Sequence, residues 1–431
     1  MPALDGSLHL DEPTRNTDSQ DLGHYVTRQP IAVLRPGSVR DIETMIRFCR
    51  RHGITVATKG RANSTHGQTL TTGLLIETGT LKAIQINQNT ADIQAGATWL
   101  DVTRAAFRHG LAPPVLTGYL GLTVGGTLSM GGTSTTVGAG TLVDHVRELE
   151  VVTGAGQTVR CSPIDNSRLF DAVLAGLGQY GVITRATIDL VPARPMVRSY
   201  QIPYADNETL FADLRILLDR AELSDIWAQW FPAPFIMAAQ PFDPASPPED
   251  AALLRGLHVP PAAVEIKDRP FLEFAERVDD FVEELRDTIN WDNLVKPWFN
   301  VWLPGSAVER FVGDNLATLT PRDIGPGGFV LLFALRRATL TRPNLRLPQP
   351  DNDRWVYLFN LLTTGAEDLV RRNDKLFAKA KNLGGVRYPI GSIDFTRDDW
   401  KAHYGERWTE VESAKREFDP DHIMTPGPGI F

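Results

Sequence analysis

Cysteine is scarce in this chain of 431 residues: the only two, Cys49 and Cys161, lie far apart and outside any spacing typical of a metal site. The sequence therefore argues against a disulfide framework and a zinc site, and we expect no bound metal. No uninterrupted apolar run reaches the roughly 18 residues that cross a membrane. The N-terminus lacks the basic and apolar segments of a secretory signal. We expect a cytoplasmic protein with no membrane partner.

Excess positive charge is also missing, since the net charge is -8. This balance argues against nucleic acid as a partner. Apolar residues make up 42% of the chain and charged residues 22%, which describes an ordinary globular protein. A chain of 431 residues exceeds what one hydrophobic core usually organises, so we expect two domains.

What the chain does contain is a stretch from Gly118 to Gly140 that is rich in glycine, serine and threonine and has no charged residue. A shorter polar segment, KGRANSTHGQ, runs from Lys59 to Gln68. Both have the composition of loops, and their backbones can approach a ligand closely. Concave runs of backbone N–H groups bind phosphate or pyrophosphate. The glycine spacing of the longer stretch matches neither G-x-G-x-x-G nor the P-loop, which disfavours those two nucleotide folds.

The first half of the chain alternates strands and helices after an opening that has a disordered composition. A helix should follow Ser38, with Asp41 completing a capping box, and should end at Gly53. The strand after it leads directly into Lys59–Gln68. Further elements are expected in the following ranges: helices at 101–110 and 167–176, a strand pair at 147–162 with its turn at Gly154–Gly156, and a strand at 181–191.

From about Ser199 the pattern changes to an antiparallel sheet with helices on one side. We expect the proline-rich segment 242–265 to be a surface excursion. The expected helices are 207–223, 271–289 and one beginning at Ser306, and the expected strands lie within 224–242, 295–304, 329–335 and 354–362.

Several long motifs occur in a specific order: KGRANSTHGQ, LTVGGTLSMGG, VRELEVVTGAGQTVRCS, NSRLFDAVLAGLGQYGVITRATIDLVPA, KPWFNVWLP and FDPDHIMTPGPGIF. Together they resemble the vanillyl-alcohol oxidase / p-cresol methylhydroxylase (PCMH-type) superfamily, and within it the cytokinin dehydrogenases. The resemblance implies an α+β fold: a two-subdomain PCMH-type FAD-binding domain and a substrate domain with an antiparallel sheet flanked by helices. The implied ranges are 1–195 for the FAD domain, 196–387 for the substrate domain and 388–431 for a segment that returns to the FAD domain.

The resemblance also implies which residues bind FAD. In the shorter segment they are Gly60, Arg61, Ala62, Asn63, Ser64 and Gln68. In and around the glycine-rich stretch they are Thr117, Gly118, Thr123, Gly126, Ser129 and Thr133, and a further position is Ile183.

Four positions depart from the family pattern. The family has a histidine covalently bound to the flavin where this chain has Asn63, so the resemblance predicts non-covalent FAD; His66 is the only histidine nearby. The family's catalytic aspartate is Gly118 here, and a glycine cannot act as a base. A second acidic position falls at Ala228 or Gln229, and a C-terminal glutamine is Pro428. We therefore do not expect a cytokinin as substrate.

The remaining candidates for catalysis are Tyr119, Asn300 and Asp394, and those for substrate binding are Trp298, Gln229 and Tyr388. We predict an FAD-dependent oxidoreductase that takes a hydride from a C–H next to nitrogen or oxygen in a small organic molecule, in specialised-metabolite biosynthesis. One alternative is a redox-neutral cyclase or isomerase that uses FAD as a scaffold, and another is a flavin-binding protein without catalysis. The electron acceptor is oxygen or an unidentified molecule, and the protein is a monomer or homodimer.

Overall fold

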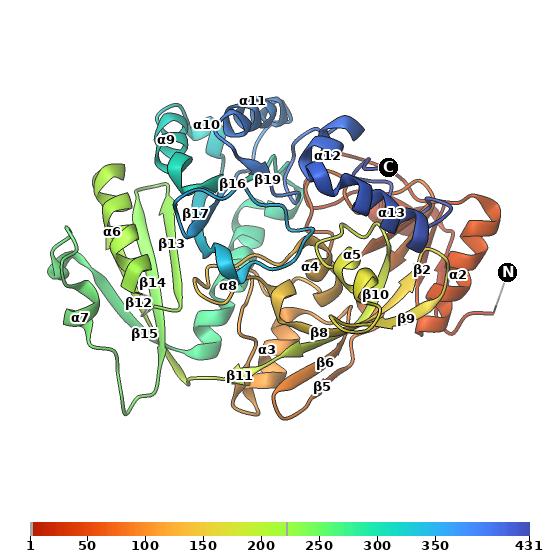
Figure 1. Cartoon of the computed structure of the whole chain (residues 1–431), viewed down its shortest axis with the longest axis horizontal. Helices are drawn as coiled ribbons and strands as arrows, with labels where there is room; N and C mark the ends of the chain where they lie inside the picture. Colours follow the sequence, from red (N-terminus) through yellow and green to blue (C-terminus); the bar gives the residue numbers. More distant parts are fainter. Residues whose placement is uncertain (1–2, 221–222) are drawn as a thin grey trace.

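The computed structural model describes residues 3–220 and 223–431. Figure 1 shows the elements of residues 196–387, in green, teal and light blue, beside those of the N-terminal part, with the dark blue C-terminal helices lying back against the latter. None of the helices in the described ranges is both long and apolar enough to span a bilayer.

The first sheet has the order β1-β2-β4-β3, and the Lys59–Gln68 segment connects its strands β3 and β4. Its strands are β1 (Ser7–His9), β2 (Ala32–Arg35), β3 (Val56–Lys59) and β4 (Leu74–Glu77). Strands β2, β4 and β3 are parallel, and helix α2 (Val39–His52) buries Ile42, Met45, Ile46 and Cys49 against them. These positions share one face of a helix, as the spacing in the sequence predicts.

Two predictions for this region are corrected. Gly53 does end α2 in the left-handed conformation, with φ 61, but Ser38 makes no side-chain cap and Asp41 instead accepts the N–H groups of Asp5, Gly6 and Gly37. The opening is also ordered, because residues 7–9 form β1 and Glu12–Thr17 form helix α1. The polar composition of the opening gave no sign of these elements, because β1 forms only by pairing with β2, which is distant in sequence.

The second sheet has the order β5-β6-β10-β8-β9. Its strands are β5 (Ile84–Ile86), β6 (Thr90–Gln94), β8 (Val146–Thr153), β9 (Thr158–Cys161) and β10 (Gly181–Asp189), and a small pair joins β7 (Leu111–Ala112) to β11 (Val191–Pro192). Helices α3 (Trp99–Phe107), α4 (Val124–Met130) and α5 (Ser167–Val173) pack on this sheet. The stretch Gly118–Gly140 was expected to be a loop along its whole length. Helix α4 lies inside it, so that expectation was wrong for residues 124–130.

The third sheet is antiparallel, has eight strands, and takes all of them from residues 196–387. In spatial order they are β15 (Glu265–Pro270), β12 (Met196–Pro203), β14 (Phe235–Phe242), β13 (Asp225–Trp230), β17 (Phe329–Arg336), β18 (Trp355–Leu362), β16 (Phe299–Pro304) and β19 (Val386–Arg387). The excursion between β14 and β15 contains the short helix α7 (Asp250–Leu254).

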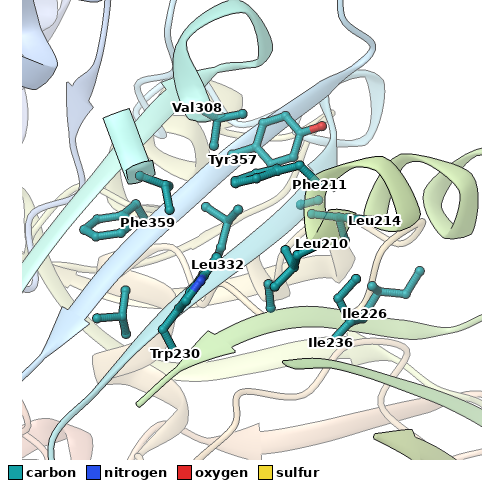
Figure 2. Close-up of a cluster of buried hydrophobic side chains, with 14 of the residues drawn as sticks. Leu210, Phe211, Leu214, Ile226, Trp230, Ile236, Val308, Leu332, Tyr357 and Phe359 are labelled. Carbon is teal, nitrogen blue, oxygen red and sulfur yellow. The ribbon is translucent and has the colours of Figure 1, made fainter. Parts of the chain in front are cut away.

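One face of this sheet carries helices α6 (Asn207–Arg220), α9 (Gly305–Leu316) and α11 (Asp368–Asn382), and the short α10 (Pro321–Ile324) lies near them. Residues 221 and 222, which end the helix expected at 207–223, lie outside the described residues. Figure 2 shows Phe211 and Leu214 of α6 meeting Leu332 and Tyr357 of the strands in an apolar core. Strand residues that alternate with these face the opposite side of the sheet.

That opposite face is partly covered by helix α8 (Phe271–Ile289), so the helices are not confined to one side as expected. Phe274 packs on Trp227 of the sheet, whereas Ala275 of the same helix packs into the core of the second sheet. Helix α8 therefore lies between the two parts of the protein.

The chain ends in α12 (Arg397–Tyr404) and α13 (Trp408–Phe418), which lie beside the N-terminal elements in Figure 1. Ile423 and Thr425 exchange backbone hydrogen bonds with Val56 of β3. Both cysteines are buried free thiols, and burial raises the pKa of each to about 12.

Candidate functional site

Two segments from different parts of the chain meet at the candidate site. We call Lys59–Gln68 the cofactor loop and Gly118–Gly140 the glycine segment. They touch at Gly60 and Thr123, where a Cβ on residue 60 would lie 2.0 Å from the Thr123 hydroxyl oxygen. Only glycine permits this approach.

The cofactor loop presents backbone donors without protein partners. Within the described ranges, no N–H group of residues 60–65 donates a hydrogen bond to another part of the chain. Ala62 adopts φ 51, a left-handed conformation that is uncommon for a residue with a Cβ and often marks a binding site. Arg61 beside it is exposed. This donor set suits the pyrophosphate of a dinucleotide, so the residues present fit FAD.

Asp21 holds the cofactor loop in place. Its buried carboxylate accepts the Gly67 N–H at 2.7 Å and the Ser64 hydroxyl at 3.1 Å. Burial raises the pKa of Asp21 to about 6, against the lowering effect of these hydrogen bonds. The carboxylate therefore stabilises the loop conformation from behind.

Gln68 also has a structural task. Its side-chain nitrogen donates to the carbonyl groups of Pro389, Ile390 and Gly391, and its oxygen accepts the His66 N–H. The cofactor loop is thereby joined to the segment after β19. The Gln68 amide nitrogen is thus used within the protein, and a role of this residue toward the cofactor stays a prediction.

The other residues predicted to bind the cofactor are near the glycine segment, with one exception. Thr123 caps α4 by accepting the Gly126 N–H, Ser129 donates to the Gly125 carbonyl, and Thr117 donates to the Tyr119 carbonyl. Gly118 and Gly126 are exposed, and Thr133 is half-buried. The exception is Ile183, whose side chain is buried in the core of the second sheet, so only its backbone is available to a ligand.

On the α8-covered face of the eight-stranded sheet, one cross-strand row carries three amide side chains. Gln229 pairs with Leu331, Leu331 with Asn360, and Asn360 with Asn300. Directly paired residues point to the same face, so these amides lie in one line across four strands. Ala228 faces the other side, in the helix-covered core.

Asn300 is completely buried and donates to the Asn360 amide oxygen at 2.7 Å. Its own amide oxygen has no hydrogen-bond partner among the described residues. Tyr388 joins this end of the row, because its backbone N–H donates to the Asn300 carbonyl, and its ring lies next to Gly131 of the glycine segment. Burial raises the pKa of Tyr388.

Tyr119 and Trp298 come together in an apolar cluster with Val278 and Val282 of α8. The predicted substrate residues lie in the amide row and in segments next to it, since Trp298 directly precedes β16 and Tyr388 donates to Asn300. Aromatic and amide side chains of this kind position an uncharged organic ring or chain.

Asp394 lies apart from the amide row and points mainly to solvent. Its side chain is 67% exposed, and its carboxylate hydrogen-bonds to His66 Nε2 at 2.8 Å. The His66 ring stacks on Tyr25, with 5.3 Å between centroids, and burial lowers the pKa of His66.

Two acidic residues were missed by the sequence analysis. Asp21 lies in the opening that was expected to be disordered. Asp279 lies on α8, where its carboxylate accepts the Leu120 N–H of the glycine segment at 2.9 Å. The signal for Asp279 was present in the helical pattern, since it lies one turn from Ala275 and Val282 on the apolar face.

Comparisons with known proteins agree with this geometry. The FAD binding domain family matches residues 30–162, and the family described as cytokinin dehydrogenase 1, FAD and cytokinin binding, matches residues 248–431. An uncharacterised oxidoreductase from the fasciation locus of Rhodococcoides fascians is 33% identical over 98% of this chain and 99% of its own length.

Two plant relatives align over nearly the whole chain. Cytokinin dehydrogenase 9 of Oryza sativa subsp. japonica is 30% identical over 99% of this chain and 91% of its own. Cytokinin dehydrogenase 1 of Arabidopsis thaliana is 30% identical over 99% of this chain and 83% of its own. Together with the two loops and the substrate sheet, these matches show that the chain is an FAD-dependent oxidoreductase and belongs to the PCMH-type FAD-binding superfamily, in the family that includes the cytokinin dehydrogenases.

Proposed function

We propose that this protein binds FAD without a covalent bond. The observation that carries the proposal is Asn63, which lies in the cofactor loop among unpartnered backbone donors and has no nucleophilic atom. His66 supports it, because its Nε2 is already hydrogen-bonded to Asp394 and its ring is stacked on Tyr25. Backbone N–H groups of residues 60–65 and of the glycine segment then bind the cofactor.

The reaction that we propose is hydride removal from a C–H next to nitrogen or oxygen in a small organic molecule. Bound FAD supplies the two-electron oxidant. Asn300, Asn360 and Gln229 orient polar atoms of the substrate, and Tyr119 and Trp298 form the apolar wall. The wall and the amide row carry no formal charge, which favours a neutral substrate.

We further propose that the substrate is a specialised metabolite rather than a cytokinin. Gly118 and Gln229 stand where the resemblance places carboxylates, so the site would orient a cytokinin amine differently. The side-chain amide of Gln229 donates as well as accepts hydrogen bonds, and Gly118 offers no side chain at all. Such a site suits a substrate that presents a carbonyl or hydroxyl oxygen.

Acid precipitation of the yellow protein tests the binding mode. Non-covalent FAD passes into the supernatant, whereas a yellow pellet would contradict the Asn63 argument. Anaerobic mixing with a panel of donors tests the reaction: isopentenyladenine as a cytokinin, benzylamine as a simple amine and benzyl alcohol as a simple alcohol. The proposal predicts that a donor bleaches the flavin and that isopentenyladenine is not the fastest. Product formation without bleaching would instead indicate redox-neutral chemistry.

A further inference from the structure

The site needs a group that accepts a proton, and the glycine segment contains no carboxylate. Gly118 is exposed, and the only atom within 4 Å of a Cβ built there is Val278 Cγ2, at 3.8 Å. Gln229 is an amide, and Asp394 is mostly exposed and bonded to His66. The residue that borders the open space at Gly118 is therefore on α8.

The next residue on that helix is Asp279. Its carboxylate accepts the Leu120 N–H at 2.9 Å. This bond holds the carboxylate beside the glycine segment. Val278 and Val282, on either side of it along the helix, belong to the same apolar cluster as Tyr119 and Trp298.

Asp279 has no ion-pair partner among the described residues, although it is only partly exposed. The charged groups around it are Glu276, one turn earlier on α8, and Arg104 of α3, and those two pair with each other at 2.5 Å. Burial is the main cause that raises the pKa of Asp279 to about 6, and Glu276 adds to it. A carboxylate with this pKa is ionised at neutral pH and is a better base than an exposed aspartate.

We propose that Asp279 is the proton acceptor of this oxidoreductase, replacing from helix α8 the carboxylate that is missing at Gly118. This rests on the proposed function. A substrate N–H or O–H gives its proton to the Asp279 carboxylate, which becomes a neutral acid. The adjacent C–H bond breaks as its hydrogen leaves with both electrons as hydride, and a C=N or C=O double bond forms. Bound FAD would supply the oxidant that takes this hydride, and an external acceptor would then take the two electrons from it.

The test compares Asp279→Asn with Asp280→Asn, which changes the exposed neighbour on the same helix. Asparagine keeps an oxygen for the Leu120 N–H, so the variant retains the fold contact. With the donor that bleaches the wild type fastest, Asp279→Asn should slow anaerobic flavin reduction on the order of 100-fold or more. Asp280→Asn should stay within twofold.

Two further readouts separate a base from a merely structural residue. The wild-type reduction rate should rise with pH through about 6 and then level off, and this rise should be absent in Asp279→Asn. Added acetate should restore part of the rate in Asp279→Ala. An Asp279→Asn variant that reduces its flavin as fast as wild type, with the same pH profile, would overturn the assignment while leaving the proposed function intact. A wild-type protein that no donor bleaches counts against the proposed function, and the assignment falls with it.

Discussion

Lys415 and Asp419 form a fully buried ion pair with 2.8 Å between the ammonium nitrogen and the carboxylate. Lys415 also donates to the carbonyls of Gln179 and Met424, and Asp419 accepts the N–H groups of Ile423 and Met424. The pair thus joins α13 to the turn before β10 and to the C-terminal segment that lies beside β3. A buried ion pair, in addition to apolar contacts, therefore attaches the C-terminal segment to the FAD-binding part.

Replacing Lys415 with methionine should destabilise the protein by about 3–5 kcal/mol, because it leaves the Asp419 charge buried without a partner. Urea unfolding of the FAD-free protein measures the change. Lys401→Met, at an exposed lysine of α12, is the control and should change stability by less than about 1 kcal/mol. An equal effect of the two substitutions would contradict the role given to the buried pair.

The pKa of Asp21, raised to about 6 by burial, predicts a pH-dependent stability term. The folded protein binds this proton more tightly than the unfolded chain, so the contribution of Asp21 is favourable below pH 4 and is lost as pH rises through 6. A shift of this size corresponds to about 3 kcal/mol. The unfolding free energy of Asp21→Asn, minus that of wild type, should therefore increase between pH 4 and 7.

Urea titrations at several pH values measure this difference, in which the pH dependence of all other groups cancels. Asp11→Asn changes an exposed carboxylate of the same segment whose pKa is lowered by its hydrogen bonds with Thr14, so the same difference should not increase with pH. A flat difference for Asp21→Asn would mean that Asp21 is not held in a desolvated environment.

Gly60→Ala should weaken FAD binding at least tenfold, because the added Cβ would lie 2.0 Å from the Thr123 hydroxyl oxygen and would separate the two loops. Fluorescence titration of the FAD-free protein gives the dissociation constant. Gly79→Ala is the matched control, since nothing lies within 4 Å of a Cβ at that position. Normal FAD affinity in Gly60→Ala would show that the loops need not meet.

Asp394→Asn should slow flavin reduction less than tenfold, because its exposed carboxylate serves mainly to orient His66. Stopped-flow reduction by the donor that bleaches the wild type measures this. The variant should lower the pKa of His66 further, since Asp394 is a group that raises it. A loss as large as that expected for Asp279→Asn would return the catalytic role to Asp394.

Local patterns in the sequence were sufficient for much of the fold. The apolar spacing of α2 and α8 and the glycine that ends α2 are features that neighbouring residues decide, and the structure has them where they were predicted. Small residues adjacent in sequence indicated a run of backbone donors, and the resemblance that the ordered motifs carry implied that the ligand is FAD. The capping box at Ser38 failed, because Asp41 found partners in the chain opening instead.

The tertiary structure decided which carboxylates contact the cofactor loop and the glycine segment. Asp394 was a candidate from its place in a motif, yet its side chain is exposed, whereas Asp21 and Asp279 lie in segments that carried no motif. The amide row of Gln229, Asn360 and Asn300 likewise exists only through strand register. Register and helix docking depend on how distant segments pack, so no local pattern could have placed these groups together.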